Sequence, residues 1–152
     1  PPTPIAPALV SGLFGTTDSE VLFYLALTFG LEEDPLGALQ RMAGCVESAA
    51  KEHGVKESLW MTLGISDGQT VWAVRYASDR KAPTLYYSKA VEDLVGLGLA
   101  PKAAERLGME ARIIVSEPVG KLAHAWVTVT ESSALRLRAG AAEAVPFHPT
   151  AT

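Results

Sequence analysis

The sequence contains a single cysteine, Cys45, among 152 residues, so it cannot form an internal disulfide bond. Low cysteine content of this kind is typical of reducing compartments, and we expect a cytoplasmic protein. Histidine is also scarce. His53, His124 and His148 lie far apart, and none pairs with another histidine or with Cys45 at the spacing of metal ligands. The sequence therefore predicts no metal site and no other bound cofactor.

Several motifs of common enzyme classes are missing. There is no G-x-S-x-G nucleophile motif, no phosphate-binding P-loop and no G-x-G-x-x-G dinucleotide motif. Basic residues are outnumbered, 13 against 17, and the net charge of −4 argues against a nucleic-acid binder, which would carry a clustered basic face. The longest apolar run, residues 21–27, is much shorter than the roughly 18 residues of a membrane span. We expect neither a nucleic-acid partner nor a membrane partner.

What is present is the composition of a globular domain. Apolar residues make up 48% of the chain and charged residues 20%, and the length suits one domain with its own core. The first ten residues, "PPTPIAPALV", contain four prolines, no initiator methionine and no basic signal region. We interpret residues 1–14 as an extended lead-in, and residues 1–152 as a fragment or a processed half of a longer domain.

Two helices are predicted before residue 55. Thr17 and Glu20 have the T-x-x-E spacing of a capping box, and Gly30 is placed to end the first helix. Residues 21–29 are apolar on nearly every side, which predicts a helix buried all round. In the second helix Asp34 serves as the cap, Pro35 takes the first helical position, and the apolar spacing continues to residues 53–54.

From residue 58 the apolar period changes from 3.6 to 2, which predicts antiparallel strands. Helices followed by such strands indicate an α+β fold. An Asp-Gly turn at residues 67–68 joins the first two strands. Residues 89–108 are expected to be a helical insertion and residues 139–152 a loose tail. The expected strands are 58–65, 70–77, 83–88, 111–118, 125–130 and 133–138.

The side chains within these elements allow few chemical roles. Cys45 lies on the apolar stripe of the second helix, away from a helix start or a neighbouring histidine, so we expect a buried thiol that packs. The three tryptophans, at positions 60, 72 and 126, are expected in the core or between layers. Arg75 is either a ligand-binding cation or, as we prefer, a charge on a strand edge.

Asp18 is the candidate binding residue, and two interpretations apply to it. A carboxylate in the first helical turn is stabilised by the unpaired N–H groups and by the helix dipole, which explains its presence without any ligand. Alternatively, an ionised acid fixed at a rigid helix end holds the ammonium group of a ligand. For Glu20 we expect only closure of the capping box.

The stretch "LFGTTDSEVLFYLALTFGLEEDP" resembles the C-terminal half of a class II glutamine amidotransferase domain. Its "TDSE" element is similar to the family motif T-D-x-E-[VI]. The resemblance continues through "SDGQTVWAVRYASD", "PTLYYS", "IIVSEP" and the "W…SAL" stretch, and covers roughly residues 8 to 137. It is strongest to the branch that includes ergothioneine-pathway and glutathione-degrading amidohydrolases.

The resemblance implies an N-terminal-nucleophile hydrolase sandwich, with two antiparallel sheets between helix layers (αββα). It also implies hydrolysis of a γ-glutamyl amide through a cysteine thioester. In this family the nucleophile is the N-terminal cysteine, whose own amino group is the base. An Asn-Gly pair forms the oxyanion hole and an arginine binds the glutamine carboxylate. The aspartate of the T-D-x-E element, here Asp18, holds the α-ammonium group of the substrate.

The chain departs from the family in several respects. Thr130 and Ser132 stand where the family has a proline and a glycine, and residues 89–108 resemble an insertion between strands. The N-terminal cysteine, the Asn-Gly pair and the arginine-bearing strand do not occur before Gly15. We therefore expect no catalytic residue in this chain, and we expect an N-terminal half or a partner chain to carry the catalytic cysteine. The substrate would be glutamine or a γ-glutamyl small molecule. The alternatives are a non-catalytic binding or assembly module with the same half-fold, and an unrelated α+β interaction domain.

Overall fold

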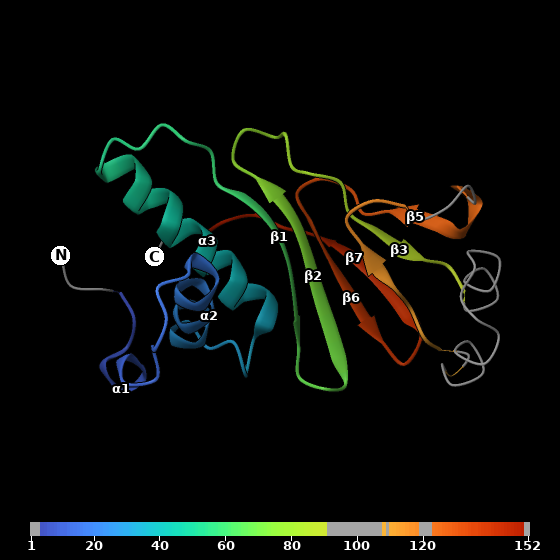
Figure 1. The fold of residues 1–152 in the computed structure, drawn as a ribbon, viewed down its shortest axis with the longest axis horizontal. Helices are drawn as coiled ribbons and strands as arrows, with labels where there is room; N and C mark the ends of the chain where they lie inside the picture. The colour runs from blue at the N-terminus through green and yellow to red at the C-terminus, as the bar shows by residue number, and fades with distance from the viewer. Residues whose placement is uncertain (1–3, 91–107, 109, 119–122, 151–152) are drawn as a thin grey trace. The chain divides into compact units, whose positions relative to one another are not determined.

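The computed structural model describes residues 4–90, 108, 110–118 and 123–150 (Figure 1). The chain divides into two units. The helical unit comprises Pro1–Glu57 and His148–Thr152, and the β unit comprises Ser58–Phe147. The predicted helical insertion at 89–108 lies outside the described residues, apart from its ends at 89–90 and 108.

The first predicted helix is present in the helical unit as α2, Asp18–Thr28. Thr17 is its N-cap, and the side-chain oxygen of Thr17 accepts a hydrogen bond from the backbone N–H of Glu20. At the other end, Gly30 has φ of +84°, and its N–H donates to the carbonyl oxygen of Leu27. These caps satisfy backbone groups at both ends of the helix, and the predicted boundaries are confirmed.

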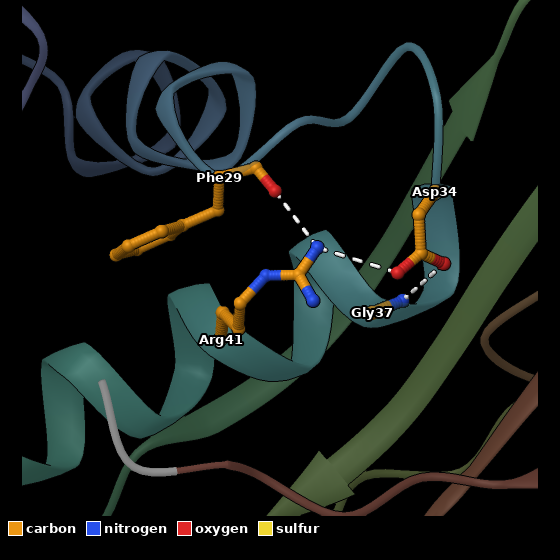
Figure 2. A network of polar contacts seen from close by, with 4 residues as sticks. All are labelled: Phe29, Asp34, Gly37 and Arg41. Atoms are coloured by element: carbon orange, nitrogen blue, oxygen red, sulfur yellow. Dashed lines mark hydrogen bonds and ion pairs between the residues drawn. The ribbon is translucent and has the colours of Figure 1, made fainter.

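The second predicted helix is α3, Pro35–Glu52. The Asp34 carboxylate caps it by accepting a hydrogen bond of 3.0 Å from the N–H of Gly37. Arg41 then joins the two helices, because its Nη2 donates to the carbonyl oxygen of Phe29 at 2.8 Å and also lies 3.3 Å from Asp34 Oδ2 (Figure 2). The end of α2 and the start of α3 are therefore held together by one guanidinium group.

Two expectations for the helical unit are wrong. The expected extended lead-in contains one helical turn, α1, Pro7–Val10, which begins with a proline at a position that proline favours. Helix α2 is not buried all round, since Val21 and Phe23 are 39% and 46% exposed. Apolar residues on every side of a helix permit burial of any face, but they do not specify which face is covered.

The β unit contains two antiparallel sheets. The larger sheet has strand order β1-β2-β6-β7, and the smaller has order β4-β3-β5. The short helix η1, Ala123–Ala125, precedes β5. The strands are β1 Trp60–Ser66, β2 Thr70–Ala77, β3 Tyr86–Ser88, β4 Ile114–Val115, β5 Trp126–Thr128, β6 Ser133–Arg138 and β7 Ala141–Pro146.

The loose tail expected over residues 139–152 is wrong up to Pro146. Strand β7 pairs with β6 along its whole length, through a two-residue turn in which Ala139 and Gly140 both have positive φ. The next residue, Phe147, is fully buried and its ring packs 5.4 Å from the ring of Tyr76. Half of the six residues of β7 are alanine, so the strand lacks the polar and apolar alternation by which strands are recognised.

The two sheets share an apolar core. Alternate residues of β2 and β6 face the residues of the smaller sheet and of its flanking segments, which places the core between the sheets. The α+β order with antiparallel strands is therefore confirmed. The buried members of this core are Ala73, Leu85, Val129, Leu135 and Leu137, with Val71, Tyr87 and Ile114 packed against them.

Two expectations for strand side chains also need correction. Trp60 lies on β1, at the edge of the larger sheet, and is 59% exposed; its indole N–H donates to Asp79. Trp126 is buried as expected, and Trp72 is half-buried. Arg75 is not an edge charge, because β2 is an inner strand of the sheet. Its guanidinium group instead donates hydrogen bonds to three backbone carbonyl oxygens.

Candidate substrate-binding site at the start of helix α2

Asp18 is the first residue of α2 and is exposed. Its Oδ1 accepts a hydrogen bond of 2.7 Å from the backbone N–H of Ser19, so one carboxylate oxygen is held by the helix backbone. No hydrogen bond within the described part of the chain uses Oδ2. The helix start is firm, because Thr17 receives hydrogen bonds from both Glu20 and Val21. Asp18 is thus a positioned carboxylate with one oxygen open to approach.

The segment that leads into this site is fastened to one face of α2. Glu20, Tyr24 and Thr28 are spaced by four residues, so their side chains share that face. Glu20 Oε1 accepts from the N–H of Phe14 at 3.0 Å, and the Tyr24 hydroxyl donates to the carbonyl oxygen of Gly12 at 2.6 Å. Thr28 Oγ1 accepts from the N–H of Ala6 at 2.9 Å. Three side chains of the helix therefore fix the segment that precedes Asp18.

Glu20 does not close the capping box as expected. Its carboxylate reaches past the N-cap residue Thr17 and accepts instead from the N–H of Phe14. Gly15 packs so closely against this carboxylate that a side chain at position 15 would collide with it. The turn at residues 14–17 is therefore shaped by a contact between Glu20 and a glycine, and this turn presents Asp18.

The electrostatics of the site favour a cationic ligand group. Asp18 and Glu20 are both in the first turn of α2, where the helix dipole stabilises negative charge. The Glu20 carboxylate accepts a hydrogen bond from the backbone N–H of Phe14. Asp18 uses only Oδ1 in a hydrogen bond, so its Oδ2 is available to a ligand. Phe14, which is 92% exposed, supplies a nearby apolar surface. This arrangement can bind an ammonium group, but the side chains that form it include no nucleophile.

Other candidate groups lie outside this site. Cys45 is within α3 and is half-buried rather than buried. His53, His124 and His148 are exposed and separate. No three histidine, cysteine, aspartate or glutamate side chains gather into a metal-binding group within residues 4–90, 108, 110–118 and 123–150. Among the helices that the structure describes, none has the length and apolar character needed to cross a membrane.

Two of the residues that shape the site are not identified by sequence reasoning. Tyr24 and Thr28 lie within an apolar stretch. Taken singly, their hydroxyl groups therefore give no sign in the sequence that they bond the backbone of the lead-in segment. The signal that could have revealed them is the spacing of four residues from Glu20, which puts three hydrogen-bonding groups on one helix face. The close contact at Gly15 has no comparable signal, because it depends on the path of the chain.

Comparison with known proteins supports the fold. No family model and no curated protein matches the chain. Among solved structures, it is similar to a glutamine aminotransferase class-II domain protein from Silicibacter pomeroyi, with a TM-score of 0.78 and 34% sequence identity. The match covers 96% of this chain and 58% of that protein's chain, so this chain spans little more than half the length of the similar structure. The chain has a class II glutamine amidotransferase-like fold.

Proposed function

We propose that this chain is part of a class II glutamine amidotransferase-type hydrolase that acts on a γ-glutamyl amide through a cysteine thioester. The observation that carries the proposal is the likeness to the class-II domain protein, which extends over nearly the whole chain. The position of Asp18 within the T-D-x-E element agrees with it, because this aspartate opens a helix and keeps one carboxylate oxygen available.

In this proposal Asp18 binds the α-ammonium group of glutamine or of a γ-glutamyl small molecule. The thiolate of a cysteine outside this sequence attacks the γ-carbonyl carbon, forms the thioester and releases the amine or ammonia. Water then hydrolyses the thioester, which releases glutamate and regenerates the cysteine thiol. This chain contributes substrate positioning and no catalytic residue. The ergothioneine-pathway and glutathione-degrading branch, and a cytoplasmic location, belong to the same proposal.

The cysteine would be supplied by an N-terminal half or a partner chain that completes an αββα sandwich. Three exposed features support such a partner. Among the described residues, β1 pairs only with β2, so its outer edge is available for another strand. Trp60 is exposed on that strand, and Phe14 and Phe23 are exposed in the helical unit. An unpaired strand edge that carries an exposed aromatic side chain offers both the hydrogen-bonding groups and the apolar surface that an added strand would cover.

The first experiment compares glutaminase activity with and without the cysteine-bearing part. We expect no turnover of glutamine by the purified 152-residue chain, because no residue in it is placed to form the thioester. We expect turnover when the chain is coexpressed with, or fused to, the segment that begins with the cysteine. Steady turnover by the 152-residue chain alone would contradict this division of roles.

The second experiment tests Asp18 in the reconstituted enzyme. Asp18→Asn keeps the shape and removes the charge, and we expect glutamine binding to weaken about ten- to a hundredfold, as for the loss of a charge-assisted hydrogen bond. The loss of the dipole interaction should cost no more than about 1 kcal/mol of stability. Glu32→Gln is the matched control, because Glu32 is exposed and lies beyond the other end of α2.

Two outcomes would overturn parts of the proposal. Unchanged glutamine affinity with a lower melting temperature would make Asp18 a helix-start residue only. A reconstituted complex that assembles and binds glutamine but forms no thioester would indicate the alternative, a non-catalytic binding or assembly module with the same half-fold. Mass spectrometry of the complex incubated with glutamine tests the second outcome, because the acyl intermediate adds mass to the cysteine-bearing segment; glutamine titration and thermal melting of Asp18→Asn test the first.

A further inference from the structure

An open hollow of about 330 Å³ lies at the β6–β7 hairpin of the larger sheet. Arg136 and Arg138 are two residues apart on β6, so both side chains project from the same face of the strand. Glu143 of β7 is paired with Arg136, and Ala139 and Ala141 at the turn complete the lining. All of these residues belong to the β unit, so the hollow is formed within that unit.

The Arg136 side chain is positioned but incompletely paired. Its guanidinium carbon lies 5.7 Å from the centre of the Trp72 ring, which faces it from the neighbouring strand β2. The Nε atom is buried and has no hydrogen-bond acceptor in the described structure. The Nη1 atom is 3.8 Å from Glu143 Oε2, which is longer than a hydrogen bond. Because Nε is covered, an added oxygen atom would reach the guanidinium group at its Nη side, where the contact with Glu143 is long.

Arg138 brings a second guanidinium group to the same hollow. Its side chain is exposed; Nη2 donates a long hydrogen bond of 3.5 Å to Gln69 Oε1, and the guanidinium group also attracts the carboxylate of Asp67. Two positive side chains and one negative side chain therefore line the hollow, which leaves a net positive charge. The spacing of alternate strand residues, about 7 Å, allows two guanidinium groups to share one oxyanion.

We propose that this hollow binds the oxyanion group, carboxylate or phosphate, of a small organic molecule between Arg136 and Arg138. One anionic oxygen accepts from the half-exposed guanidinium group of Arg136 at its Nη side, and another accepts from Arg138. The small side chains of Ala139 and Ala141 leave room for the rest of the molecule. Arginine suits this role because its planar donors match the oxygens of a carboxylate or phosphate. The proposal is independent of the amidotransferase function and involves no residue of the α2 site.

The test is a titration of the 15N-labelled 152-residue chain at constant ionic strength. Inorganic phosphate is the first probe and acetate the second, with chloride as the balancing anion. We expect a saturable shift of the Arg136 Nε–Hε resonance, which Arg136→Lys identifies by removing it. Saturation by phosphate alone assigns a phosphate ligand, and saturation by acetate alone assigns a carboxylate. Absence of a saturable shift with both probes overturns the proposal.

Substitutions distinguish specific anion binding in the hollow from non-specific electrostatic attraction to the protein. Arg138→Gln leaves the stacked Arg136 in place, and we expect it to weaken binding of the effective probe about tenfold or more by calorimetry. Arg136→Lys keeps the charge but lacks the planar guanidinium donors, and we expect a similar loss. Arg80→Gln is the control, since Arg80 is exposed and outside the hollow. An equal loss in Arg80→Gln and Arg138→Gln would overturn the proposal, provided that thermal melting shows both variants folded.

Discussion

Arg75 Nη1 donates a hydrogen bond of 2.7 Å to the carbonyl oxygen of Val129, which follows 54 residues later in the sequence. The same guanidinium group donates to the carbonyl oxygens of Pro83 at 2.8 Å and Ala82 at 3.2 Å. The backbone N–H of Ala82 in turn donates a hydrogen bond to the carboxylate of Glu131. Arg75 therefore links an inner strand of the larger sheet to the segments before β3 and after β5 of the smaller sheet.

Arg75→Lys should destabilise the protein although the charge is retained. A lysine ammonium group cannot donate in the three fixed directions of the guanidinium group, so at least one carbonyl oxygen would lose its partner. We expect a loss of about 1–3 kcal/mol in chemical denaturation. Arg80→Lys is the matched control, with an expected change within about 0.5 kcal/mol because Arg80 is exposed. Equal stability of the two variants would contradict the linking role of Arg75.

Gly15 and Glu20 should be energetically coupled. Glu20→Ala removes the acceptor for Phe14 N–H, and Gly15→Ala pushes the Glu20 carboxylate away from the same N–H. We expect each variant to cost about 1 kcal/mol, and the double variant to cost no more than either alone. Gly64→Ala is the control, because nothing lies within 4 Å of a β-carbon there. Additive losses in the double-mutant cycle would show that the two residues act independently.

Asp67 should contribute to the acid sensitivity of the fold. Hydrogen bonds from the N–H groups of Thr70 and Gln69 lower the pKa of this carboxyl below its ordinary value of 3.8. A lowered pKa in the folded state stabilises the protein above pH 3.8, and this stabilisation is lost as the pH falls through the lower folded-state value. Melting temperatures measured from neutral to acidic pH should therefore fall less steeply in Asp67→Asn. Glu57→Gln, an exposed control, should follow the parent protein.

Cys45→Ala should have little effect. The thiol is half-buried within α3 and distant in sequence from the start of α2, so the substitution removes only packing. We expect a loss of about 1 kcal/mol or less in thermal or chemical denaturation. The reconstituted enzyme should keep its turnover of glutamine. Loss of turnover in a folded Cys45→Ala complex would place the nucleophile in this chain rather than in the proposed N-terminal half.

Sequence alone predicted the elements whose ends depend on local chemistry. Thr17 and Asp34 cap α2 and α3 with their own side chains, and Gly30 and Gly54 take the positive φ that ends those helices. The strands at 70–77 and 133–138 also match the predicted ranges, because each has a clear apolar signal. The family resemblance in the T-D-x-E element is likewise carried by a few adjacent residues, and the fold agrees with it.

Only the tertiary structure decided the features that depend on distant partners. Strand β7 forms because β6 pairs with it, although its alanine-rich sequence has little strand character of its own. Arg75 became a structural donor because the carbonyl oxygen of Val129, 54 residues later, meets those of Ala82 and Pro83 at its guanidinium group. Glu20 bonds Phe14 rather than closing the capping box, because the lead-in segment folds back along α2. Local propensities and caps are encoded within a few residues, whereas burial and long-range hydrogen bonds depend on which segments the folded chain brings together.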